Sequence, residues 1–437
     1  MQITPLHHWI ATKLGVKGSA LTRELIQNYQ LHKLKQTLAV AVQHSPFYRK
    51  KLTGWPKLTS LADVKHLPFT TAEDIRGNPL HFLCVSQDQI NRVVTLRSSG
   101  TTGAPKRVFF TKADQELTID FFHIGMSTLV GPGDRVLILL PGELTGSVGD
   151  LLARALTRLG ARGIPQGLVA DPAQTLAIIQ AAEVNSLVGI PSQVLALARY
   201  RDERGRRVPL GLKSVLLSTD YVPQAIRREL EQNWGCPVFN HYGMTEMGLG
   251  GGVECAALAG YHLREADLYF EMIDPISGEL VPDGKMGEIV FTTLTRQGMP
   301  LIRYRTGDWA RFLPEPCPCG TSLRSMGLVV GRVKGACGLA GGALTMAELD
   351  EVLFGVPGLL NYEASLTCFE GTDRLTIGLK MVGGVDDRGL AEIKNALAKL
   401  PVIERSISQG CLELHLSILP DQMVVSTAKR CLNDLRK

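Results

Sequence analysis

The chain has 437 residues, of which 45% are hydrophobic and 20% are charged, and its formal net charge is +5. This length favours two or three domains, and no concentrated basic tract indicates a nucleic-acid partner. No apolar run is long enough to cross a membrane, residues 1–13 lack the apolar core of a signal peptide, and nine scattered cysteines indicate a reducing, cytoplasmic compartment.

The first part of the chain is predicted to be helical. Residues 19–52 carry apolar side chains at helical spacing, and Pro46 is expected to end this helix. Thr70 and Glu73 are spaced as a capping box, which predicts a short helix after residue 70.

A loop rich in glycine and hydroxyl groups joins two predicted strands, 92–96 and 108–111. Its sequence is Ser98-Ser99-Gly100-Thr101-Thr102-Gly103-Ala104-Pro105-Lys106. The glycines permit a tight bend, the hydroxyls offer hydrogen-bond donors, and Lys106 supplies a cation, a combination that suits a triphosphate. The spacing is not that of a Walker A loop, and the loop alone is equally compatible with a flexible surface segment.

Strands and helices alternate between residues 112 and 237. Apolar strands are predicted at 135–140, 186–190 and 214–217, and Asp171-Pro172 is typical of the start of a helix. This alternation predicts an α/β fold with a mostly parallel sheet flanked by helices. Ligands of such sheets bind at the carboxyl ends of the strands.

The character changes to antiparallel β after residue 240, with strands predicted at 269–273 and 287–293 around a turn at 274–278. The expected boundary lies near residue 331, which gives a large domain, 1–331, with a β subdomain at about 240–330. Residues 332–437 form a small α+β domain. In it Thr345 and Glu348 are spaced as a capping box, strands are predicted near 361–368, 374–382 and 411–418, and a helix near 387–399.

Three further motifs follow the glycine loop in a fixed order. They are Tyr242-Gly243-Met244-Thr245-Glu246, Ile302-Arg303-Tyr304-Arg305-Thr306-Gly307-Asp308 and Gly331-Arg332-Val333-Lys334. Together the four motifs resemble the adenylate-forming superfamily of acyl-CoA synthetases and adenylation domains, and most of all its phenylacetate–CoA ligase branch. The resemblance covers nearly the whole chain and implies a mobile C-terminal domain.

The resemblance implies a role for each motif. The loop from Ser98 to Lys106 would hold the β- and γ-phosphates of ATP, Thr245 would contact the α-phosphate, and Glu246 would help to hold Mg²⁺. The other assignments are Tyr242 with Gly243 and Met244 beside the adenine, Asp308 on the ribose hydroxyls, Arg332 on the nucleotide from the other side, and Lys334 at the hinge. Taken singly, Asp308 is more typical of a turn and Glu246 of a solvated carboxylate, whereas Lys334 is equally typical of a linker.

The activity that the resemblance implies is the joining of a small carboxylic acid to coenzyme A, through an acyl-adenylate made from ATP. One departure bears on the first step: Thr427 stands before Ala428-Lys429-Arg430, where the branch has a lysine, and residues 340–344 also differ from the branch. A protein that binds ATP or an acyl-adenylate with weak turnover, or an enzyme with a non-CoA acceptor, therefore remains an alternative. The sequence does not decide between a monomer and a homodimer.

A second group of residues suits a metal. Cys255, His262, Cys317 and Cys319 would give Zn²⁺ a closed tetrahedral site of three thiolates and one imidazole, which is structural rather than catalytic. The alternative is ordinary buried cysteines and a turn pair. The other six cysteines are predicted to be packing residues, namely Cys84, Cys236, Cys337, Cys368, Cys411 and Cys431.

The acyl pocket is expected to be lined by residues 141–147, 218–223 and 241–250. Within these segments, Glu143 would face a polar or cationic acyl group or else solvent. His241 would contact a carboxylate or else be a structural histidine.

Overall fold

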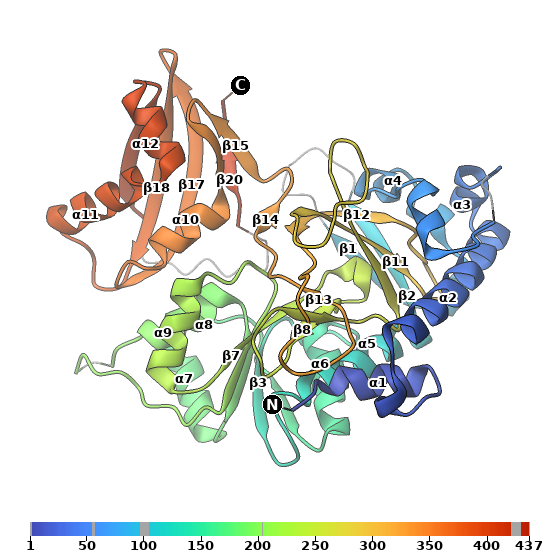
Figure 1. Ribbon diagram of the computed structural model, residues 1–437. Coiled ribbons are helices and arrows are strands. Elements are labelled where there is room, and N and C mark those ends of the chain that lie inside the picture. Colours follow the sequence, from blue (N-terminus) through green and yellow to red (C-terminus); the bar gives the residue numbers. More distant parts are fainter. Residues whose placement is uncertain (1, 55–56, 97–104, 203, 421–429, 437) are drawn as a thin grey trace. The chain divides into compact units, whose positions relative to one another are not determined.

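The computed structural model describes residues 2–54, 57–96, 105–202, 204–420 and 430–436 (Figure 1). The chain forms two compact units, each of which has its own hydrophobic core. The first contains Met1–Gly133, Gly142–Gly163 and Phe239–Val329, and the second Asp134–Pro141, Ile164–Val238 and Val330–Lys437. Within the described ranges, every helix is too short or too polar to span a bilayer.

The first unit begins with helices, as predicted. These are α1 (Pro5–Lys13), a 3₁₀ turn (Gly18–Ala20), α2 (Arg23–His44) and α3 (Pro46–Lys51). The long helix ends before Pro46 as expected, but Pro46 also begins α3, because the Ser45 hydroxyl accepts the Tyr48 N–H as an N-cap at 3.2 Å.

Three 3₁₀ turns and one short helix follow. The helix is α4 (Ala72–Gly77), and the turns are Leu61–His66, Pro79–Phe82 and Gln87–Gln89. The capping box of α4 is formed by Thr71 and Asp74, so the predicted pair Thr70 and Glu73 was wrong by one residue. The reason is that Thr70 is fully buried and its hydroxyl donates to the Ile302 carbonyl at 2.7 Å, which leaves it unavailable as a cap.

The predicted hairpin is present. Strand β1 (Ile90–Leu96) pairs antiparallel with β2 (Lys106–Thr111), and Leu96 opposes Lys106 where the strands meet the connecting loop. Residues 97–104, which hold Ser98 to Gly103, lie outside the described residues. Helices α5 (Lys112–Met126) and α6 (Val148–Arg158) follow in the same unit.

The antiparallel character after residue 240 is confirmed. One group of strands is β7 (Val238–Tyr242), β8 (Gly252–Glu254), β9 (Tyr261–Leu263) and β13 (Ser325–Met326), and the other is β10 (Leu268–Ile273), β11 (Gly287–Thr293) and β12 (Tyr304–Ala310). A 3₁₀ turn, η5 (Thr245–Met247), follows β7. The side chains of Tyr48, Phe291 and Tyr304 are among the most deeply buried of this unit.

The second unit contains the predicted parallel sheet. Strands β3 (Arg135–Leu139), β5 (Ser186–Gly189) and β6 (Ser214–Leu217) run parallel, and β4 (Arg162–Pro165) begins at the junction of the two units. The helices are α7 (Pro172–Ala181), α8 (Pro191–Arg199) and α9 (Gln224–Trp234). Asp171 caps α7 as predicted, since its carboxylate accepts the N–H groups of Ala173 and Gln174.

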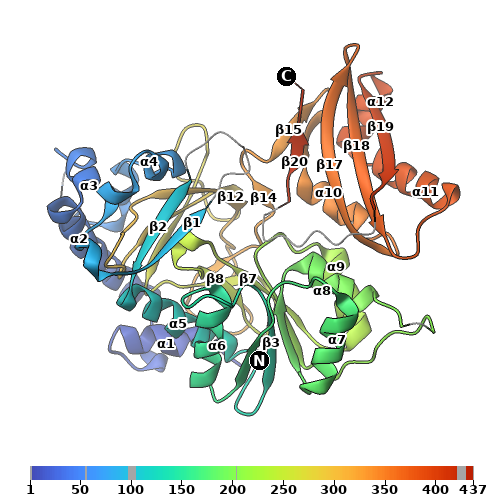
Figure 2. The ribbon, with the colours of Figure 1, turned by 180° about the vertical axis from the view of Figure 1, so that it is seen from behind.

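The rest of this unit is α+β. Its elements are β14 (Gly331–Arg332), β15 (Ala336–Leu339), β16 (Gly342–Thr345), α10 (Met346–Leu353), β17 (Leu359–Phe369), β18 (Thr372–Met381), α11 (Asp387–Ala398), α12 (Pro401–Ser408), β19 (Leu412–Ile418) and β20 (Leu432–Asp434). The sheet order is β19-β18-β17-β20, and α10, α11 and α12 cover one of its faces in both views (Figures 1 and 2). The Thr345–Glu348 capping box is confirmed.

Contacts within the second unit join these residues to α8. The Arg199 guanidinium donates to the carbonyls of Phe354 and Leu359. The second unit therefore combines residues 330–437 with parts of the chain that precede residue 331. The domain boundary expected near residue 331 stays a prediction. The mixed α/β fold class is confirmed, with parallel strands, antiparallel strands and flanking helices.

Candidate functional site

A buried polar cluster joins residues of three of the motifs. Lys106, the first residue of β2, forms an ion pair with the Glu246 carboxylate on η5. The Tyr304 hydroxyl accepts from Lys106 at 3.2 Å and donates to Glu246 at 3.0 Å. The side chains of Lys106 and Glu246 are 12% and 2% exposed, so the structure places Glu246 as a buried, paired carboxylate rather than a solvated one.

A second polar pair also involves β12. The Tyr242 hydroxyl donates to Oδ2 of Asp308 at 3.0 Å. Asp308 is fully buried within the strand, which excludes a turn at this position. Burial and the negative charge of Asp308 both raise the pKa of Tyr242 well above its usual value, so the phenol stays a donor.

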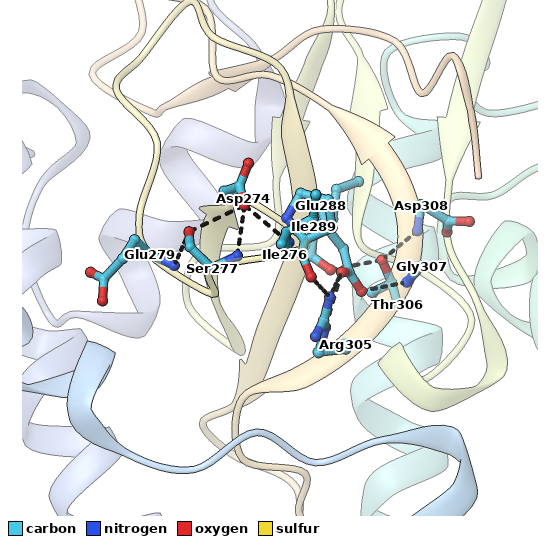
Figure 3. A network of polar contacts seen from close by, with 11 residues as sticks. Asp274, Ile276, Ser277, Glu279, Glu288, Ile289, Arg305, Thr306, Gly307 and Asp308 are labelled. Carbon is cyan, nitrogen blue, oxygen red and sulfur yellow. Dashed lines mark hydrogen bonds and ion pairs between the residues drawn. The ribbon is translucent and has the colours of Figure 1, made fainter. Parts of the chain in front are cut away.

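The backbone around Asp308 is held by the neighbouring strand (Figure 3). The Asp308 N–H donates to the Thr306 hydroxyl at 3.0 Å, and Thr306 donates to the Ile289 carbonyl at 2.7 Å. The Gly307 N–H donates to the Glu288 carboxylate at 3.0 Å, and Glu288 is also paired with Arg305. The Asp308 carboxylate points away from this network in Figure 3, and its Oδ2 is the atom that accepts from Tyr242.

The turn between β7 and η5 needs its glycine. A Cβ on Gly243 would lie 2.2 Å from the Leu249 carbonyl oxygen, so no larger residue fits without displacing the backbone. Tyr242 ends β7, Gly243 and Met244 connect it to η5, and Thr245 opens η5 directly before Glu246.

The remaining predicted nucleotide residues belong to other parts of the chain. Arg332 and Lys334 are exposed and lie in the second unit. Ser98 to Gly103 and Thr427 fall outside the described residues.

The predicted metal ligands lie together. The ligand atoms of Cys255, His262, Cys317 and Cys319 are all buried and within 4.8 Å of one another. Nε2 of His262 is 3.3 Å from the Cys255 sulfur and 3.4 Å from that of Cys319, and the Cys255 and Cys317 sulfurs are 3.7 Å apart. A tetrahedron of ligands about 2.0–2.3 Å from Zn²⁺ has edges of about 3.5–3.8 Å, so the donor set fits this ion.

Three other cysteines were wrongly predicted to be packing residues. Cys84, Cys236 and Cys337 are buried as expected, but Cys368, Cys411 and Cys431 are exposed. Each exposed cysteine lies at or beside the end of a strand in the sheet β19-β18-β17-β20, where its side chain is not covered.

The segments expected to line the acyl pocket differ in their surroundings. Glu143 is exposed. His241 lies beside the rings of Phe121 and Phe122, and burial lowers its pKa to about 4, so its imidazole is neutral at physiological pH. Contact between His241 and a substrate carboxylate stays a prediction, and in it the neutral imidazole would donate a hydrogen bond through a ring N–H.

Sequence reasoning missed a network in the second unit. Thr219, just after β6, has a φ of 82°, an unusual conformation for a β-branched residue. The adjacent Asp220 accepts from Arg430 at 3.1 Å, Arg430 also pairs with Asp350, and Tyr221 donates to Glu351 at 2.6 Å. The signal that could have found it is the acidic pair at 350–351 in a predicted amphipathic helix.

Comparisons with known proteins agree with one another. The family model described as AMP-binding enzyme matches residues 56–295. The chain is 31% identical to the phenylacetate-coenzyme A ligase of Thermus thermophilus over 366 residues, 80% of each protein. It is 31% identical to that of Escherichia coli over 353 residues, 78% of each. A solved structure of 2-hydroxyisobutyryl-CoA ligase in the postadenylation state, in complex with R3-HIB-AMP, has the same fold, with a TM-score of 0.80 and 22% identity over 95% of this chain and 91% of that one.

Proposed function

The chain belongs to the AMP-binding enzyme family, in its phenylacetate–coenzyme A ligase branch, and we propose that it joins a carboxylic acid to coenzyme A with conversion of ATP to AMP. In the first step a carboxylate oxygen attacks the α-phosphorus of ATP and pyrophosphate leaves. In the second step the thiol of coenzyme A attacks the acyl carbon, loses its proton, and releases AMP.

The observation that carries the proposal is the pair of polar contacts made by β12. Tyr304 and Asp308 are four residues apart in this strand and both are buried, so their backbones lie at most about 13 Å apart. Tyr304 contacts Lys106 and Glu246, and Asp308 contacts Tyr242. The Lys106 cation, which suits phosphates, and the Asp308 carboxylate, which suits ribose hydroxyls, are thus both connected to β12.

The Lys106–Glu246 ion pair indicates how the site meets its ligands. In the free protein each charge neutralises the other. A polyphosphate would attract Lys106 and leave Glu246 to Mg²⁺, which prefers oxygen ligands. Bound Mg²⁺ would neutralise charge that develops on the phosphates. We assign Lys106, Thr245 and Glu246 to the adenylation step, and Tyr242, Gly243, Met244, Asp308, Arg332 and the loop from Ser98 to Gly103 to the nucleotide.

The test is a panel of carboxylic acids that includes phenylacetate, benzoate and 2-hydroxyisobutyrate. Pyrophosphate release and loss of free thiol are measured with ATP, with and without coenzyme A, and with no acid as the control. We expect at least one acid to give one thiol lost for each pyrophosphate. ATP binding without pyrophosphate release for any acid favours a binding protein, and pyrophosphate release without thiol loss favours another acceptor.

We also propose that Cys255, His262, Cys317 and Cys319 hold a structural Zn²⁺ with no open coordination position. The fit of the donor distances supports it, as does the Ser325 hydroxyl 3.4 Å from Nδ1 of His262, a partner that would orient the ring. Elemental analysis of untagged protein is the test, with Cys317→Ser as the variant and Cys411→Ser as the control. We expect one zinc per chain in the wild type and control, and loss of zinc with lower thermal stability in Cys317→Ser. Zinc-free wild type contradicts the proposal.

Domain movement remains part of the proposal. Residues 1–331 and 332–437 would be the large and small domains, with Lys334 at the hinge. The protein would be cytoplasmic and would act as a monomer or a homodimer. Limited proteolysis near residue 334, with and without ATP and acid, tests the hinge. An unchanged cleavage pattern in every state contradicts it.

A further inference from the structure

Lys106 and Glu246 come from segments that are 140 residues apart in the sequence, so their approach depends on what holds the two backbones together. Lys106 opens β2, and Glu246 lies on the short turn η5. A three-residue turn has little internal hydrogen bonding, so its position is fixed mainly by its neighbours.

Arg296 contacts the backbone of both segments. It follows β11, and its Nη1 donates to the Glu246 carbonyl at 2.7 Å, while its Nη2 donates to the Phe109 carbonyl in β2 at 3.1 Å. The guanidinium also lies 4.4 Å from the centre of the Phe110 ring. One side chain therefore ties the turn that carries Glu246 to the strand that carries Lys106.

The segment that carries Arg296 is anchored in turn. The Asp114 carboxylate, in the first turn of α5, accepts the N–H groups of Gln297 at 2.7 Å and of Gly298 at 3.0 Å. Thr295, on the other side of Arg296, donates to Asp267 at 2.8 Å. The backbone on both sides of Arg296 is therefore held in place, which fixes the position from which its guanidinium extends.

The chemistry of the position favours arginine. Arg296 is 9% exposed, and within the described residues no carboxylate lies at ion-pair distance from it. Burial lowers its pKa to about 10, which leaves it charged at neutral pH. A planar fork reaches two carbonyls from different segments, whereas the single ammonium of lysine does not reproduce both directions. The negative charge of Asp114 offsets only part of the effect of burial on the pKa of Arg296. A buried cation with no carboxylate at ion-pair distance is costly for folding, which fits a residue that serves the site.

We infer that Arg296 is a positioning residue that sets the place of Glu246 relative to Lys106, and through Glu246 the response of the site to Mg²⁺. The inference rests on the proposed function, since it takes the Lys106–Glu246 cluster as the phosphate and magnesium site. Among the described residues, the hydrogen bonds of Arg296 to this site go to backbone carbonyls.

The test compares Arg296→Lys with Arg227→Lys. Arg227 is a control because it has the same exposed fraction (9%) and donates to a backbone carbonyl (Val238, 2.7 Å), but it belongs to the second unit, whereas Lys106, Glu246 and Arg296 belong to the first. ATP binding is titrated by calorimetry at several Mg²⁺ concentrations, which needs no turnover, and kcat and KM are measured separately with an accepted acid.

We expect Arg296→Lys to raise the Mg²⁺ concentration for half-maximal ATP binding about tenfold and to lower kcat about 10- to 100-fold, the size typical of residues that orient metal ligands. Arg227→Lys should change both by less than about threefold, although it loses a similar amount of thermal stability. Equal effects of the two variants would overturn the inference. A wild-type protein that binds Mg²⁺ and ATP but converts no acid would contradict the proposed ligase activity and would leave the inference about Arg296 to the binding measurements.

A second variant covers the case in which Arg296→Lys does not fold. Asp114→Asn replaces one of two acceptor oxygens with a donor, so it loosens the segment that carries Arg296 while keeping the side-chain volume. We expect the same shift in Mg²⁺ dependence, smaller in size. A folded Asp114→Asn protein with the wild-type Mg²⁺ dependence would also overturn the inference.

Discussion

The Lys106–Glu246 ion pair allows a prediction about stability that is independent of activity. Lys106→Met should strand a carboxylate that is only 2% exposed, and breaking a buried pair in this way costs about 3–5 kcal/mol. Glu246→Gln should cost less, about 1.5–3 kcal/mol, because it removes the more buried charge and leaves an ammonium that is 12% exposed and reaches water. The double variant should be more stable than Lys106→Met, since it contains no unpaired charge.

The assay is thermal unfolding of the free protein at neutral pH, without nucleotide or divalent metal. For a unit of this size, 1 kcal/mol shifts the midpoint by about 2–4 °C, so Lys106→Met should lower it by about 6–20 °C. Equal destabilisation by the two single variants, or a coupling energy below about 0.5 kcal/mol, would refute the reasoning.

Three further predictions concern single residues. Asp308→Ala should raise KM for ATP about 10- to 150-fold, the loss of one charge-assisted hydrogen-bond partner, in steady-state kinetics; an unchanged KM contradicts its ribose role. Thr427→Lys should raise the adenylation rate by up to about 10²–10³-fold, measured as pyrophosphate exchange, if the site is short of one cation; no gain in a sluggish enzyme argues against that. The pKa of His241 is lowered to about 4, so the unfolded chain takes up a proton first and stability falls as pH drops from about 6.5 towards 4; His241→Gln should flatten this pH dependence of the unfolding midpoint, and an unchanged slope would show that another group causes it.

Much of the fold follows from local patterns. The parallel strands β3, β5 and β6 are continuous apolar runs, and the antiparallel pair β10 and β11 flanks a turn rich in polar residues, so both were predicted. The capping box at Thr71 was placed one residue early, because the sequence does not reveal that Thr70 contacts Ile302 across 232 positions.

The candidate site was predictable in part. The motifs name Lys106, Glu246 and Asp308, and the structure adds how they are held. Tyr304 bridges Lys106 and Glu246, and Arg296 supports both. Neither contact could be predicted, because both depend on chain segments that come together only in the folded protein and follow no fixed spacing.

The cysteine and histidine cluster has a consequence for the order in which the chain matures. Cys255 and Cys317 are 62 positions apart, and the segment between them contains β10, β11 and β12. An ion held by both would act as a cross-link around this loop, and restricting a loop of this length in the unfolded chain is worth about 4 kcal/mol. During synthesis the cross-link cannot close until Cys319 has left the ribosome, by which time the strand that carries Asp308 has been made. Metal binding would then follow the synthesis of β10, β11 and β12, so zinc starvation should reduce the yield of newly made protein more than the activity of protein already folded.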